Sequence, residues 1–342
     1  MYFPGHDPLQ KEPHLISLGQ GPKVRAATLS VASNAVLVLG KLVVGLSIGS
    51  VSVISEAIHS AVDLLAAVIA WFAVRLSGQP ADKEHPYGHG KYENLSGAVE
   101  AALIFLAAIW IVMEAVAKLR HGGEVEAPGW GVGVMAISAI MNLFVSRHLF
   151  RVGRATDSLA LQADALHLRT DVWTSAGVLA GLAIIWIGKI LFPAIDLYWV
   201  DPVSAIAVAL LIVHAAWEMT VHATRGLLDE ALPQEDIDFI RQTALDRGDI
   251  RSLHDLKTRK AGPERIIDAH VAVDYTLNVL EGHDKGKSFK GNLLAHWPMS
   301  WVNIHVDPCD GSCKAPCLSG CLLTAQARSA EHEAWDARQA GG

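Results

Sequence analysis

The sequence has little charge for its length: Asp, Glu, Lys and Arg make up 18% of the 342 residues, whereas 51% are hydrophobic. This balance is too apolar for an ordinary soluble protein and indicates that much of the chain lies in a membrane. An excess of basic residues is also lacking, because the net charge is −7. A nucleic-acid partner, which would require a basic face, is therefore not expected.

Cysteine is nearly missing and is confined to one place. The four cysteines all lie between Cys309 and Cys321, so disulfides cannot staple a core. Residues 1–21 contain Pro, Gly and His but no apolar stretch, and we expect no cleavable signal peptide.

The apolar residues are concentrated in the first two thirds of the chain. A membrane-spanning helix requires about 20 predominantly apolar residues. Six segments meet this requirement, at residues 26–49, 50–76, 95–117, 128–149, 159–188 and 202–221. We therefore expect an all-α six-helix transmembrane domain at residues 25–224, after an N-terminal segment at residues 1–24. The alternative is that one weak segment is re-entrant or interfacial.

Positive charge predicts the orientation of the spans, because basic loops stay in the cytoplasm. Six basic residues lie in the loops after the second and fourth segments, namely Arg75, Lys83, Lys91, Arg147, Arg151 and Arg154. The opposite loops contain three, namely Lys118, Arg120 and Lys189. With an even number of spans, we expect a multi-pass protein of the inner (plasma) membrane with both termini in the cytoplasm.

After the last span the sequence becomes mixed and polar. A helix at residues 233–247, strands at 252–259 and 265–274, a helix at 277–295 and a strand at 300–306 are predicted. This order, αββαβ, predicts a cytoplasmic α+β domain of ferredoxin-like or metallochaperone-like type at residues 230–308. Residues 309–342 are expected to form a flexible, cysteine-containing tail, which beyond Cys321 is either disordered or a frayed helix.

Two of the predicted spans carry the same motif: an acid, Ala, an aliphatic residue, His, three further residues and Asp. It places His59 and Asp63 in the second span, and His167 and Asp171 in the fifth. Residues four apart lie on one face of a helix. An Asp or Lys at the centre of a span costs about 2.5–3.5 kcal/mol. Such residues are therefore expected to face the protein interior and to serve a function.

Two such faces turned toward each other would present two imidazole nitrogens and two carboxylate oxygens. This tetrahedral set suits Zn²⁺, and the carboxylates would neutralise its charge. The alternative is that these are packed polar residues that bond across helices. The other ionisable residues of the spans are expected to be pore-lining, paired or interfacial rather than ligands, namely Glu56, Glu100, Glu114, Asp164, Arg169 and Glu218.

The six spans, the two His-x₃-Asp pairs and the following αββαβ domain, in this order over residues 26–308, resemble the cation diffusion facilitators. The resemblance implies a homodimeric antiporter, not an enzyme, that exchanges a divalent metal ion for protons. It also implies a transport site made of His59, Asp63, His167 and Asp171. Histidine at position 59 is similar to the zinc-preferring branches, so Zn²⁺ is the expected substrate, with Cd²⁺, Co²⁺, Ni²⁺ or Fe²⁺ as alternatives.

The loop after the second span contains Asp82, His85 and His89. By itself, a His-x₃-His pattern near an acid is equally compatible with a polar turn. The resemblance favours metal, because bacterial relatives bind a second ion at the matching positions. It also implies that Lys91 pairs with Asp229 at the junction between membrane and cytoplasm.

The resemblance further implies a binuclear, metal-sensing site in the cytoplasmic domain that bridges the dimer. Its matching positions are His254, His270, His283, His305 and Asp307. Because His305 and Asp307 alternate along a strand, both are expected to leave from one face. The helix around His283 departs from the pattern, since it contains three glycines, each costing about 1 kcal/mol relative to Ala. We expect this helix to be frayed.

The four cysteines are spaced four residues apart, which on a regular helix would align the thiols in a stripe. Gly311, Pro316 and Gly320 argue against such a helix. In a reducing cytoplasm, soft-metal binding and free thiols are both open to this segment.

Three other functions are alternatives to a proton-coupled transporter. An intramembrane metalloprotease requires a His-Glu-x₂-His helix and an open zinc position, and the sequence has no such motif. A metal-regulated scaffold of the same fold would have no use for the intact pairs in the second and fifth spans. A passive channel would differ from an antiporter only in ignoring the proton gradient.

Overall fold

The computed structural model describes residues 13–48, 51–121, 130–191 and 199–340. The chain forms two compact units, Met1–Leu227 and Leu228–Gly342. Residues 1–12 of the predicted N-terminal segment, and the predicted turn at residues 49–50 between the first two spans, lie outside the described residues.

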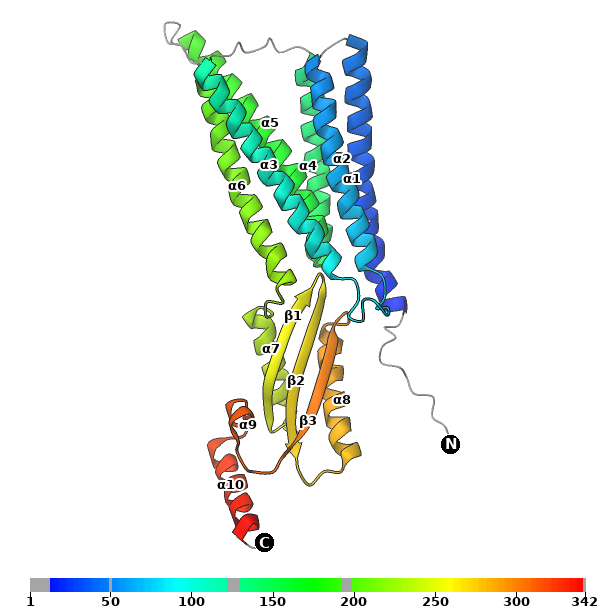
Figure 1. The fold of residues 1–342 in the computed structure, drawn as a ribbon, viewed down its shortest axis with the longest axis vertical. Helices are drawn as coiled ribbons and strands as arrows, with labels where there is room; N and C mark the ends of the chain where they lie inside the picture. The colour runs from blue at the N-terminus through cyan, green and yellow to red at the C-terminus, as the bar shows by residue number, and fades with distance from the viewer. Residues whose placement is uncertain (1–12, 49–50, 122–129, 192–198, 341–342) are drawn as a thin grey trace. The chain divides into compact units, whose positions relative to one another are not determined.

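The first unit contains the six long helices that the sequence predicts (Figure 1). They are α1 (Pro13–Ile48), α2 (Val51–Ser77), α3 (Lys91–His121), α4 (Trp130–Ala155), α5 (Leu159–Leu191) and α6 (Val200–Leu227). Within the described residues, α1, α2, α3 and α6 are long and apolar enough to cross a membrane by composition alone. Helices α4 and α5 are of similar length and carry charged residues such as Arg147 and Arg151 on α4 and Asp164 and Arg169 on α5.

Helix α5 packs against each of the other five long helices of the first unit. Nearly every side chain at residues 159–170 is buried. Ala73 of α2 packs in one apolar cluster with Ala160 and Ala165 of α5. Small side chains let two helices approach closely, and this packing brings the polar residues of α2 and α5 to the same place.

The second unit has the predicted order αββαβ, so the α+β prediction is confirmed. Its elements are α7 (Gln234–Arg247), β1 (Ser252–Ala261), β2 (Glu264–Asp274), α8 (Val279–His296) and β3 (Trp301–Cys309). Strand β2 is central, pairing antiparallel with β1 and parallel with β3. Ile240 of α7, Ile267 of β2, and Phe289 and Leu293 of α8 are fully buried in the core.

Helix α8 is not frayed, and that expectation was wrong. It runs for 18 residues and begins with a capping box, in which Asn278 and Glu281 satisfy each other's backbone N–H groups. Gly282 and Gly286 are buried against β3. A Cβ at position 286 would lie 2.7 Å from Cγ2 of Val306. The glycines allow the helix to lie close to the sheet, and this packing outweighs their low helix propensity.

The residues after β3 are also ordered into helices, α9 (Ala315–Ser319) and α10 (Ala325–Ala340), where a flexible tail was expected. The backbone N–H of Leu253 on β1 donates to the carbonyl of Gly320 at 2.9 Å. Arg251 forms an ion pair with Glu331 of α10. These contacts join residues far apart in sequence, so the local composition of the segment did not reveal them.

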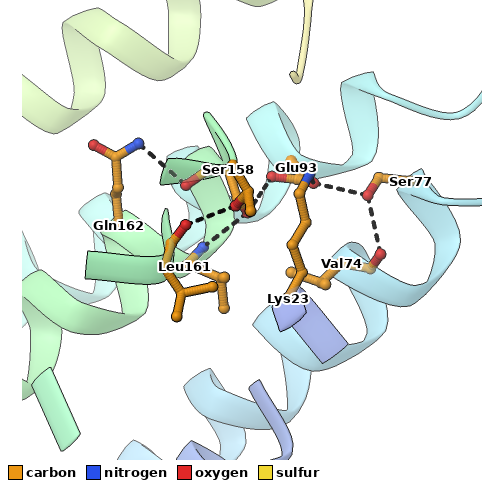
Figure 2. Close-up of polar contacts among 9 residues, drawn as sticks. Lys23, Val74, Ser77, Glu93, Ser158, Leu161 and Gln162 are labelled. Atoms are coloured by element: carbon orange, nitrogen blue, oxygen red, sulfur yellow. Dashed lines mark hydrogen bonds and ion pairs between the residues drawn. The ribbon is translucent and has the colours of Figure 1, made fainter. Parts of the chain in front are cut away.

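A buried charge cluster joins several parts of the first unit (Figure 2). Lys23 of α1 donates to Oε1 of Glu93 on α3 at 3.1 Å, and only 1% and 0% of the two side chains are exposed. Ser77 of α2, and Ser158 just before α5, donate to the same carboxylate. The cluster gives Lys23 a buried partner. Lys23 lies within α1, which begins at Pro13, well before residue 26, where the first span was expected to begin.

Replacing Lys23 with Met is expected to destabilise the bundle, because it leaves the Glu93 carboxylate buried without its cation. Removing one partner of a buried ion pair costs about 3–5 kcal/mol. Thermal unfolding of the purified chain in detergent should show a lower midpoint, which the added change Glu93→Gln should largely restore. Arg25→Met is the control, since Arg25 is exposed on the same helix. An unchanged midpoint for Lys23→Met would contradict this role of the ion pair.

Candidate functional site

The two His-x₃-Asp motifs face each other inside the first unit. Ligand atoms of His59, Asp63 and Asp171 lie within 4.8 Å of one another. His167 is in contact with this group through Asp63, because its Nε2 lies 3.1 Å from Oδ1 of that carboxylate. The structure therefore brings together all four residues that the sequence singled out in the second and fifth spans.

This intramembrane group is shielded on one side and open on the other. Asp63 and His167 are only 4% and 5% exposed. Asp171 is partly buried, and His59 is exposed. The contact between Asp63 and His167 therefore lies deeper among the helices than His59 does.

Two polar residues beside the group were missed by the sequence analysis. Asn142 of α4 donates from Nδ2 to Oδ2 of Asp171 at 3.3 Å. Lys41 of α1 is 5% exposed, donates to Oγ of Ser60 at 2.8 Å, and interacts electrostatically with Asp171. A lysine isolated within an apolar span is a signal that could have identified Lys41. Nothing in the sequence around Asn142 marked it.

Two further carboxylates lie near the group. Glu100 of α3 and Asp164 of α5 are 0% and 1% exposed, and they interact electrostatically with each other. Asp164 also interacts with His167 and Asp63. Neither carboxylate was expected to be a ligand, and within the described ranges neither belongs to a group of close ligand atoms.

The loop between α2 and α3 forms a second group, in which ligand atoms of Asp82, His85 and His89 lie within 4.8 Å of one another. Oδ1 of Asp82 lies 3.5 Å from Nδ1 of His85, and Oδ2 lies 3.4 Å from Nε2 of His89. The backbone N–H of His85, together with that of Glu84 and the nearby histidine rings, holds the pKa of Asp82 below its ordinary value. The carboxylate is thus charged and oriented toward both rings.

A third group lies on the sheet of the second unit. His270 of β2 is paired in register with His254 of β1 and with His305 of β3. The carboxylate of Asp307 is central to this row: Oδ2 lies 2.9 Å from Nδ1 of His270 and 3.3 Å from Nε2 of His254, and Oδ1 lies 3.2 Å from Nε2 of His305. One carboxylate therefore contacts three imidazoles.

Asp255 is a further residue of this group that the sequence analysis missed. Ordinary strand alternation would place it on the opposite face from His254. The pairing of β1 with β2 is irregular between His254 and Lys257, and Asp255 has a φ of 47°. As a result, ligand atoms of His254, Asp255 and His270 lie within 4.8 Å of one another. A bulge of this kind re-aims a side chain.

His283 is the one predicted cytoplasmic ligand that the second unit does not bring to the others. It is exposed on α8 and, among the residues that the structure describes, belongs to no group of close ligand atoms. Helix α8 packs against the side of β3 that carries Val306. His305 and Asp307 leave from the other side of the strand. A role for His283 in metal binding stays a prediction.

The predicted pair between Lys91 and Asp229 also stays a prediction, because it would connect the two units. Within the first unit, Lys91 Nζ donates to the carbonyl of Leu227 at 3.5 Å. Within the second, Asp229 accepts a hydrogen bond from Arg259 at 2.9 Å.

Two protein-family models match the chain: the cation efflux transmembrane domain at residues 27–228, and the cation efflux protein, cytoplasmic domain, at residues 232–309. The cation-efflux pump FieF of Serratia proteamaculans (strain 568) is 32% identical over 284 residues, which are 83% of this chain and 92% of the relative. FieF of Salmonella paratyphi A is 31% identical over 285 residues, with the same coverage of 83% and 92%. A solved structure of CzrB is 34% identical and covers 22% of this chain and 96% of its own, with a TM-score of 0.22. The two family models and the FieF matches show that this chain belongs to the cation diffusion facilitator family of cation efflux transporters.

Proposed function

We propose that this transporter exports Zn²⁺ from the cytoplasm through the site formed by His59, Asp63, His167 and Asp171. The observation that supports it is the meeting of the two motifs, with three ligand atoms within 4.8 Å of one another and His167 3.1 Å from Asp63. Two imidazole nitrogens and two carboxylate oxygens suit a tetrahedral Zn²⁺ ion. Cd²⁺, Co²⁺, Ni²⁺ and Fe²⁺ are the alternative substrates.

Protons are the counter-ion in this proposal. Metal ligands must be deprotonated, so a metal ion and protons compete for the same atoms. Nε2 of His167 and Oδ1 of Asp63 lie at hydrogen-bonding distance, and a proton between them must leave when the ion binds. Zinc entering from the cytoplasm thus releases protons, and protons arriving from the opposite side release zinc.

We assign a regulatory role to the group on the sheet. Asp307 contacts His270 through Oδ2 and His305 through Oδ1, so its carboxylate could join two ions. The protein would act as a homodimer in the lipid of the inner membrane, with both termini in the cytoplasm. Metal held by the sheet would draw the two protomers together and favour one access state of the membrane domain. The loop group around Asp82 is proposed as a second accessory metal site.

Asp63→Asn and Asp171→Asn should each lower zinc flux into proteoliposomes by at least about tenfold. Loss of a metal ligand should reduce activity at least as much as loss of a residue that only orients a ligand. Glu218→Gln is the matched control, since Glu218 is a carboxylate on α6 with a 71% exposed side chain. Undiminished flux in Asp63→Asn would remove the intramembrane site from the proposal. An equal loss in Glu218→Gln would show general damage instead.

An acidic vesicle lumen should accelerate zinc uptake into proteoliposomes, because protons on the receiving side displace the ion from its ligands. Uptake would be followed with a zinc-sensitive dye in the lumen, at equal pH and with the lumen more acidic than the bath. A protonophore should return the rate to its value at equal pH. A rate that ignored the gradient would replace antiport with facilitated diffusion.

The double variant His270→Ala, His305→Ala should raise the zinc concentration that gives half-maximal flux while leaving the maximal flux intact, because the intramembrane ligands are unchanged. Asn303→Ala is the matched control: Asn303 is exposed on β3, two residues before His305, and binds Asp268. The same concentration dependence in the double variant and the native chain would reduce the second unit to a dimerisation platform.

A further inference from the structure

The four cysteines gather around one cavity in the second unit. Cys309, Cys313, Cys317 and Cys321 all line a cavity of about 320 Å³, together with His254 and Asp307. All four are free thiols. They come from different local structures. Cys309 ends β3, Cys317 lies on α9, and Cys321 forms an isolated β-bridge with Ser252, the first residue of β1. The thiols therefore surround the cavity rather than forming a stripe on one helix.

The thiols are also close enough to affect one another. The side chains of Cys309 and Cys317 lie close enough to interact with each other. Cys313 interacts electrostatically with both Cys309 and Cys321. Within the described residues no three of these thiols lie within 4.8 Å of one another, so coordination of one ion by all four would require the side chains to move closer together.

One side of the cysteine segment is fixed to the edge of the sheet. Oγ of Ser252 donates to the carbonyl of Cys317 at 2.7 Å, and the N–H of Leu322 donates to the carbonyl of Arg251 at 2.9 Å. Gly320 is required here, because a Cβ at this position would collide with the carbonyl oxygen of Leu253. The residues around the last two cysteines are therefore held against β1.

The other side of the segment is fixed by α10. Nδ1 of His332 lies 2.9 Å from the carbonyl oxygen of Gly311. Gly311 has a φ of 85°, and a Cβ there would collide with the carbonyl of Glu331. Cys313 itself adopts a φ of 49°, which is uncommon for a residue with a side chain. Contacts on both sides thus fix the backbone of the cysteine segment, and its four thiols stay partly exposed.

Positive charge lies beside the thiols. Arg328 lines the cavity and interacts electrostatically with Cys313. Arg251 interacts with Cys309. These cations would help to balance the negative charge of thiolates bound to a metal ion.

We propose that Cys309, Cys313, Cys317 and Cys321 form a thiolate site for a thiophilic metal ion such as Zn²⁺, Cd²⁺ or Cu⁺. Four thiolates around one ion are a common structural zinc site, and thiolates select soft ions. The site adjoins the histidine row but is distinct from it, and three of its cysteines lie beyond residue 309, where the match to the cytoplasmic-domain family model ends. It does not depend on which ion is transported.

The site can be tested on the full-length chain, reduced and purified in detergent, by titration with Cd²⁺. Bonds from sulfur to cadmium absorb in the ultraviolet, whereas the histidine and carboxylate sites give no such band. The band should saturate at a single ion per chain. Cys313→Ser and Cys321→Ser should each weaken Cd²⁺ binding by at least about tenfold. Ser319→Ala, an exposed change in the same segment, should leave the band intact.

Alkylation followed by mass spectrometry gives a second readout that does not depend on the variants. Cd²⁺ should protect all four cysteines of the native chain from alkylation. The absence of the band, a band unchanged in both serine variants, or protection of Cys309 and Cys317 alone would each overturn the four-thiolate site. If the air-equilibrated protein contains a disulfide in this segment, and still gives no cadmium band after that disulfide is reduced, the segment would be reassigned to redox chemistry. None of these measurements involves transport, so they are independent of the proposed zinc export.

Discussion

The contact between α2 and α5 is the constraint on which the first unit depends. Burying Asp63 and Asp171 within 4.8 Å of each other is unfavourable without compensation, since like charges repel and buried carboxylates lose their hydration. The structure supplies compensation from three neighbours: the imidazole of His167, the amide of Asn142 and the ammonium of Lys41. The bundle therefore maintains an electrostatic environment that a divalent cation would complete.

The three groups of histidines and carboxylates share one arrangement. In each, one carboxylate contacts at least one imidazole: Asp63 lies beside His167, Asp82 beside two loop histidines, and Asp307 beside three histidines of the sheet. A carboxylate that contacts an imidazole orients the ring and fixes which nitrogen is available. The groups differ in burial, from the shielded Asp63 to the exposed Asp82, so ions would exchange with solvent at different rates.

Much of this organisation could be predicted from the sequence, because it is encoded locally. Apolar length and helical spacing predicted the six helices and the faces of His59 and His167, and alternation predicted that His305 and Asp307 share a face. What escaped prediction depends on contacts between distant residues. Asp255 joins its group through an irregularity in strand pairing, and Gly286 serves packing on β3. Lys23 finds its buried partner on a different helix, 70 residues away.

The close approach of α8 to β3 has a mechanical consequence. At Gly286 no side chain separates the helix backbone from Val306 of the strand. A shift of α8 cannot be absorbed there by a change of rotamer, so it passes directly to β3. Strand β3 carries His305, Asp307 and Cys309 at alternate positions on its other face. A displacement of α8 would therefore be transmitted to the nitrogen, oxygen and sulfur donors on that strand.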